Sequence, residues 1–134
     1  MIKTLLVDDD SKFRVLFKRF LEKKYDFLVF EAEDGIQGLE IFDKEKLDLV
    51  FLDIDLPKLN GREFLEQVRK IDQIIPVIIL TNLDDRNVVR EMVTLGIQDY
   101  LLKTKFVTQM SDRVSLVLRK LKLVKKNFGM STGF

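Results

Sequence analysis

The sequence contains no cysteine and no long apolar run. Without cysteine, the chain can form no disulfide bond and can offer no thiolate to a metal ion. It has no stretch of about 18 apolar residues and no signal-peptide pattern at its start, so we expect neither a membrane span nor a secretion signal. The net charge of +1 gives no overall attraction to nucleic acid or to an anionic membrane. A cytoplasmic location is therefore expected.

The length and composition are those of one small domain. The chain has 134 residues, of which 46% are apolar and 11 are Phe, so material for a core is ample. Because no repeat or linker interrupts the pattern, we predict one domain over residues 1–126. Residues 127–134 hold two glycines, a serine and a threonine, and we expect them to form a flexible tail.

Short apolar runs alternate with helical patterns along the chain. Between the runs, apolar residues recur at spacings of three and four, which is the period of an amphipathic helix. Five helices are expected, and the last would run from Val107 to Val124. The predicted strands are Ile2–Val7, Phe27–Phe30, Leu47–Leu52, Pro76–Leu80 and Tyr100–Leu102.

Two of these helices have more detailed expectations. The first is indicated by apolar residues on one stripe, including Leu16 and Phe17. Asp34 is expected to cap the second helix. The buried side of that helix would carry Ile36, Leu39 and Phe42.

Strict alternation of five strands with five helices predicts an α/β fold. Such a pattern is typical of a parallel sheet that is covered by helices on both faces. Right-handed crossovers leave few topologies, of which strand order 2-1-3-4-5 is a common one. We therefore predict a doubly wound, flavodoxin-like fold.

Polar residues stand at the carboxyl ends of four of these strands. Asp8 and Asp9 follow the first strand, Asp53 the third, Thr81 the fourth and Lys103 the fifth. In an open parallel sheet these ends lie on one edge, where doubly wound folds bind their ligands. Three carboxylates repel one another unless a cation lies among them, and oxygen ligands of this kind suit Mg²⁺.

Each of these residues also has an ordinary structural explanation. Acids at the start of a helix cap it and compensate its dipole, although one of Asp8, Asp9 and Asp10 would be enough. Thr81 fits strand propensity or a cap, and lysines such as Lys103 are usually solvated. Chance is a poor explanation for all of these residues standing at matching strand ends, so the pattern favours a functional site.

The order and spacing of four segments identify a family resemblance. Over roughly residues 2–125, the chain resembles the receiver domain of two-component response regulators, and among these it is similar to the chemotaxis regulators. Each segment alone is weak, but all four in this order are highly specific. The segments are Leu5–Asp10, Asp53–Gly61, Ile78–Thr81 and Gly96–Lys103.

The resemblance implies a role for each acidic residue. Asp53 would accept a phosphoryl group from a histidine kinase or a phosphotransfer protein. Asp9 and Asp53 would bind Mg²⁺ directly, Asp8 would act mostly through a metal-bound water, and the Asp55 backbone carbonyl would complete the protein ligands. These implied roles agree with the chemistry of phosphoryl transfer, which depends on positioning and on neutralising the charge of the phosphoryl oxygens.

The resemblance also implies a switch. Lys103 would contact one phosphoryl oxygen, Thr81 would hydrogen-bond another, and Tyr100 would move inward with Thr81. The altered surface would be that of the fourth helix, fifth strand and fifth helix. It would bind a downstream target, and a phosphorylation-dependent homodimer is a further possibility. Such a protein is a signalling module, which catalyses only its own phosphoryl transfer and slow autodephosphorylation.

One departure from the family pattern concerns the lysine. Thr104 follows Lys103, where receivers usually have Pro after a cis bond. A cis bond costs about 0.5–1 kcal/mol before Pro but ~2.5–4 kcal/mol before other residues. We therefore expect a trans Lys103–Thr104 bond, with Lys103 either displaced from the site or reaching it by another rotamer.

Other functions remain as alternatives. A haloacid-dehalogenase-like phosphohydrolase would use Asp53 and Asp55 as its DxD pair, although that pair usually lies on the first strand. A nucleotide-binding protein would need a glycine-rich loop after the first strand, which is missing. A pseudo-receiver scaffold would not need the full set of acids, Thr81 and Lys103. The predicted last helix is rich in basic residues, and we interpret them as a solvent-exposed face of the helix. We expect no nucleic-acid-binding domain.

Overall fold

The chain folds around a five-stranded parallel sheet with strand order β2-β1-β3-β4-β5. The structure, a computed structural model, describes residues 1–82, 86–105 and 113–121. The predicted doubly wound α/β fold and its strand order are confirmed. The strands are β1 (Ile2–Val7), β2 (Phe27–Ala32), β3 (Leu49–Asp53), β4 (Val77–Thr81) and β5 (Asp99–Leu102).

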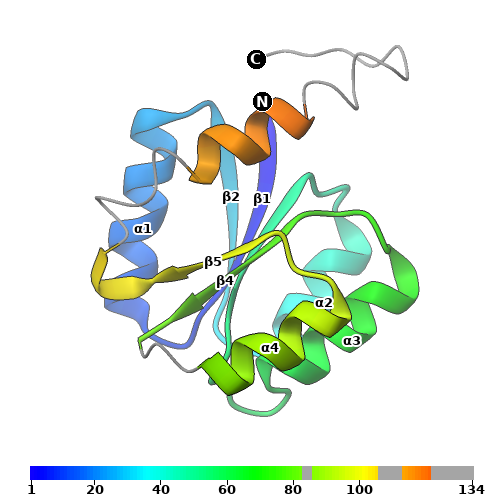
Figure 1. The fold of residues 1–134 in the computed structure, drawn as a ribbon. Helices are drawn as coiled ribbons and strands as arrows, with labels where there is room; N and C mark the ends of the chain where they lie inside the picture. Colours follow the sequence, from blue (N-terminus) through cyan, green and yellow to red (C-terminus); the bar gives the residue numbers. More distant parts are fainter. Residues whose placement is uncertain (83–85, 106–112, 122–134) are drawn as a thin grey trace.

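Helices cover both faces of the sheet (Figure 1). Helix α1 and the helix over residues 113–121 pack on one face, where the core includes Phe17 and Val117. Helices α2, α3 and α4 pack on the other face, where the core includes Phe64 and Met92. The bounds are α1 (Ser11–Lys24), α2 (Gly35–Lys44), α3 (Gly61–Ile71), α4 (Arg86–Leu95) and a 3-10 helix η1 (Lys103–Lys105).

The strand ends differ slightly from the prediction, in a way that matters for the site. Asp53 and Thr81 are the last residues of β3 and β4 rather than the first residues after them. In the parallel register Asp53 lies beside Leu80, and Thr81 lies beside Leu102. The carboxyl ends of the strands therefore form one edge, as the sequence predicted.

Two expectations about helix faces are wrong. Leu16 of α1 and Ile36 of α2 are exposed, at 57% and 46% of their surface. Helix α2 instead packs through its glycines, since a Cβ atom on Gly38 would lie only 2.8 Å from the Phe64 ring. This close approach turns the glycine face of α2 inward and leaves Ile36 in solvent, whereas Asp34 caps the helix as predicted by accepting a hydrogen bond from the Gln37 amide.

Some expectations lie outside the described residues. They are the domain end at residue 126, the tail over residues 127–134 and the parts of the predicted last helix over residues 107–112 and 122–124. Within the described part of the chain, no helix is both long and apolar enough to span a membrane.

Candidate functional site

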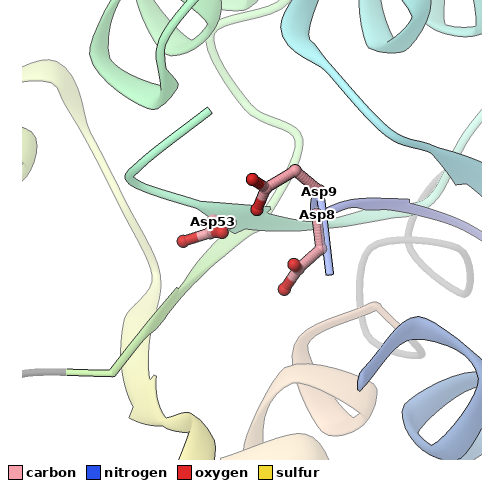
Figure 2. Close-up of side chains that lie close together, drawn as sticks. All are labelled: Asp8, Asp9 and Asp53. Atoms are coloured by element: carbon pink, nitrogen blue, oxygen red, sulfur yellow. The ribbon is translucent and has the colours of Figure 1, made fainter. Parts of the chain in front are cut away.

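Three carboxylates meet at the carboxyl edge of the sheet. One oxygen from each of Asp8, Asp9 and Asp53 lies within 4.8 Å of the other two. Figure 2 shows how the side chains gather from the ends of β1 and β3. Asp8 is fully buried and Asp53 nearly so, whereas Asp9 is exposed. An oxygen cluster of this kind that is open on one side can hold a hard cation which keeps part of its water shell.

The local sequence leaves these three acids available for such a cation. The N-cap of α1 is Asp10, whose side chain accepts hydrogen bonds from the amides of Lys12 and Phe13. Asp8 lies two residues earlier and accepts a hydrogen bond from the Asp10 amide at 2.8 Å. The capping role that could have explained the whole acidic run is therefore filled by Asp10.

Lys103 supplies the positive charge of the site. Its Nζ lies 2.6 Å from Asp8 Oδ2 and 3.1 Å from Asp53 Oδ2. The ammonium also lies 4.9 Å from the centre of the Phe13 ring, within range of a cation–π interaction. Lys103 is only 7% exposed, so its charge is compensated almost entirely by these groups.

The two central groups influence each other's protonation. Burial raises the pKa of the Asp53 carboxyl to about 6, and the charge of Asp8 adds to the rise, while Lys103 opposes it. Burial alone would lower the pKa of Lys103, but hydrogen bonds and charges from Asp8 and Asp53 outweigh it and raise that pKa. Lys103 is therefore charged at neutral pH, and Asp53 is mostly ionised.

The Lys103–Thr104 peptide bond is trans, which confirms the expectation from the missing proline. The chain continues directly into the short helix η1. Lys103 nevertheless reaches Asp53 Oδ2 at 3.1 Å, so the trans bond does not displace it from the site.

The loop after β3 curls tightly around Asp53. The Asp55 amide donates to Asp53 Oδ1 at 3.3 Å, while the Asp55 side chain is exposed. A Cβ atom on Gly61 would lie 2.6 Å from the Asp53 carbonyl oxygen, so only glycine fits there. Asn60 and Glu63 form a capping box that fixes the start of α3. Asp55 thus contributes backbone rather than its carboxylate to the immediate surroundings of Asp53.

Thr81 and Tyr100 flank the site on β4 and β5. Thr81 is 6% exposed and Tyr100 is half-buried. The Arg113 guanidinium lies 6.0 Å from the centre of the Tyr100 ring and pairs with Asp99. Tyr100 itself packs against the core on the α2, α3 and α4 face of the sheet, and Arg113 reaches its ring from the last helix.

Sequence reasoning missed two neighbours of the site, Phe13 and Arg14. Phe13 lies on the apolar stripe of the first helix, and its ring also faces Lys103. Arg14 donates from Nη1 to the Asp8 carbonyl oxygen at 2.5 Å. Their positions one turn into α1, directly after the acidic run, were the available signal.

Comparison with known proteins decides the family. The family model of the response regulator receiver domain matches residues 4–115. The chain belongs to this family. It is thus a receiver domain of two-component response regulators, a signalling domain rather than a metabolic enzyme.

Relatives and solved structures agree with this assignment. The domain is 34% identical to sporulation initiation phosphotransferase F of Bacillus subtilis, over 87% of this chain and 93% of that protein. It is 31% identical to the chemotaxis protein CheY of Listeria monocytogenes, over 90% of this chain and 98% of that protein. A receiver domain protein from Clostridium thermocellum matches with a TM-score of 0.84 and 29% identity, over 92% of this chain and 99% of that one.

Other matches are longer than this chain or carry ligands. The chain spans 49% of the transcriptional regulatory protein PhoP of Bacillus subtilis, to which it is 35% identical over 88% of its own length. The response regulator TrrA of Thermotoga maritima, in complex with Mg²⁺-BeF, matches with a TM-score of 0.78 and 26% identity, over 87% of this chain and 99% of that one. These comparisons do not support the haloacid-dehalogenase alternative.

Proposed function

We propose that this receiver domain is a phosphorylation-activated switch, in which Asp53 accepts a phosphoryl group from a histidine kinase or a phosphotransfer protein in an Mg²⁺-dependent reaction. One observation carries the proposal. The Lys103 ammonium bridges Asp8 and Asp53 at 2.6 and 3.1 Å, beside a group of three carboxylate oxygens within 4.8 Å of one another.

The charges of the site fit a divalent cation. Three ionised carboxylates and one ammonium leave two negative charges, which Mg²⁺ would neutralise. Asp9 and Asp53 would bind the ion directly, Asp8 would act through a bound water, and the Asp55 carbonyl would complete the set. When bound, Mg²⁺ supplies charge neutralisation to the oxygens of the transferred phosphoryl group.

The chemistry at Asp53 is nucleophilic. A carboxylate oxygen of Asp53 attacks the phosphorus of a phosphohistidine, the P–O bond forms, and the P–N bond to the imidazole breaks. Lys103 already lies against the Asp53 oxygen and would contact the phosphoryl oxygens of the product. Because the Lys103 charge is in place before the reaction, little reorganisation of this side chain is needed.

The response to phosphorylation would pass through Thr81 and Tyr100. A hydrogen bond from Thr81 to the phosphoryl group exists only in the phosphorylated state, so it shifts the equilibrium between two arrangements. Tyr100 would follow Thr81 inward and alter the surface of α4, β5 and the last helix. That surface would bind a downstream target or a second phosphorylated copy.

Hydrolysis of the acyl phosphate would be slow. Leu83, two residues beyond Thr81, is apolar and would hinder the attacking water. It lies outside the described residues, so this part of the proposal rests on sequence alone.

Intact-mass measurement after incubation with acetyl phosphate tests the proposal. We expect wild type to gain one phosphate mass with Mg²⁺ and none with EDTA. Asp53→Ala should gain none in either condition. Equal labelling of wild type and Asp53→Ala would remove Asp53 as the acceptor.

A further inference from the structure

Arg14 links three elements beside the acidic cluster. It lies on α1 and its side chain is 15% exposed. Nη1 donates to the Asp8 carbonyl oxygen at 2.5 Å, and Nε donates to Glu31 Oε1 of β2 at 3.3 Å. Lys18 holds the other Glu31 oxygen at 3.5 Å. The planar guanidinium is thus fixed at two points through two different nitrogen atoms, which also sets the orientation of its plane.

The Asp8 carbonyl matters because it belongs to the peptide bond that leads into Asp9. A peptide unit is planar, so the direction of this carbonyl sets the rotation of the whole Asp8–Asp9 plane. The Asp8 amide, on the other side of the same residue, donates to the Ala32 carbonyl at 3.0 Å. Asp8 is therefore held from both its peptide groups.

Asp9 depends on this restraint more than its neighbours do. Asp8 is fully buried and paired with Lys103, and Asp53 is paired with Lys103 as well. The Asp9 side chain is exposed, and within the described part of the chain no hydrogen bond or ion pair is seen to its carboxylate. Its direction is accordingly set by the backbone that carries it.

We infer that Arg14 is a positioning residue, which aims the Asp9 carboxylate at the metal site through the Asp8–Asp9 peptide. Glu31 holds Arg14 in place for this purpose. The inference rests on the proposed function, because it concerns the same Mg²⁺ site. It adds to that site a residue that holds a metal ligand in place without touching the metal. Mutation of such residues typically changes metal affinity by roughly 10- to 100-fold.

A simple charge effect would have the opposite sign. Arg14 is a cation close to a site for a second cation, so Coulomb repulsion alone would make removal of its charge tighten Mg²⁺ binding. Positioning predicts weaker binding. The sign of the change in affinity therefore separates the two roles.

The experiment is calorimetric titration of the protein with Mg²⁺. We expect Arg14→Gln to weaken Mg²⁺ binding by roughly 10-fold, which is the lower end of the effects seen when residues that orient metal ligands are mutated. Arg14→Lys keeps the charge but loses the fork, so its affinity should fall between those of wild type and Arg14→Gln. Glu31→Gln should weaken binding in the same direction but less, because Arg14 keeps its contact with the Asp8 carbonyl.

Two controls make the result specific. Arg19 lies on the same helix and is exposed, so Arg19→Gln removes the same charge without touching Asp8, and Mg²⁺ binding should not weaken. Amide chemical shifts of metal-free Arg14→Gln should differ from those of metal-free wild type at Asp9 and Asp10. The melting temperature of the variant should stay well above the temperature of the titration. If Arg14→Gln does not fold, Arg14→Lys carries the test, because it keeps the charge and loses only the two-point contact of the guanidinium.

Asp9→Asn separates this inference from the proposed function. If Asp9→Asn binds Mg²⁺ as wild type does, the proposed metal site itself is wrong. If Asp9→Asn loses Mg²⁺ while Arg14→Gln and Arg14→Lys bind it as tightly as wild type or more tightly, the site stands and the positioning role of Arg14 is overturned.

Discussion

At the scale of single residues, the Asp53 carboxyl group combines burial with close charges of both signs. Asp8 and the buried setting disfavour its ionised form, while Lys103 favours that form. The result is a carboxylate that is present at neutral pH but costs the metal-free fold some stability. Such perturbed groups are typical of functional sites.

This cost predicts an unusual dependence of stability on pH. The pKa of Asp53 is about 6 in the folded protein, above its ordinary value of 3.8. Between these pH values the folded state binds more protons than the unfolded state, so the contribution of Asp53 to the free energy of unfolding falls as pH rises. The loss should be on the order of 3 kcal/mol, complete above about pH 7.

Urea denaturation of metal-free wild type and of Asp53→Asn measures this contribution. It is carried out from about pH 3.5 to about pH 7.5, an interval that includes both the ordinary and the raised pKa of Asp53. The stability of wild type relative to Asp53→Asn should decrease across the interval from 3.8 to about 6. A difference that does not vary with pH would contradict the buried, charge-coupled environment of Asp53.

At the scale of secondary structure elements, strand pattern and capping were predictable, and helix faces were less so. Alternation of apolar runs with helical periods indicated the sheet and its order. Asp34 was recognised as a cap because the cap depends on neighbours in sequence. The exposure of Ile36 was not predictable, because it follows from contact between Gly38 and Phe64, which come from different helices.

Gly38 provides a prediction about α2. Alanine in place of glycine favours an isolated helix by about 1 kcal/mol. Here the added Cβ would lie 2.8 Å from Phe64 Cε2 and 3.1 Å from Val7 Cγ2, in a packed region. We expect the overpacking to win, so that Gly38→Ala lowers the free energy of unfolding by about 1–2 kcal/mol.

Chemical denaturation of Gly38→Ala checks this expectation. Glu40→Ala serves as the control, because Glu40 is exposed on the same helix and its replacement should change stability by less than about 0.5 kcal/mol. A Gly38→Ala variant more stable than wild type would mean that α2 can move away from Phe64 at little cost.

At the scale of the whole molecule, the sheet brings together residues that are far apart in the sequence. Asp8, Asp53, Thr81 and Lys103 were predictable because parallel strands end on one edge. The contacts of Phe13 and Arg14 were not, since they depend on the rotation of α1 over that edge. The pairing of Arg113 with Asp99, beside the Tyr100 ring, likewise arises only from tertiary packing.

The proposed switch should appear as a change that extends from the site to one surface. Backbone amide shifts in the presence of Mg²⁺ and beryllofluoride, a phosphoryl mimic, should move at Asp53 and Thr81 and also along α4, β5 and the last helix. Thr81→Ala should keep the changes near Asp53 and reduce those on the distant surface, because the hydrogen bond that couples them is lost. Changes confined to the metal site in wild type would count against a switch.

The central claim, that Asp53 is the phosphoacceptor, has a direct chemical test. Borohydride reduces an aspartyl phosphate to homoserine, so treatment after incubation with acetyl phosphate and Mg²⁺ marks the acceptor residue for peptide mass mapping. The account predicts homoserine at position 53 in wild type, and none there when EDTA replaces Mg²⁺. Homoserine at another aspartate, with position 53 unmodified, would contradict it.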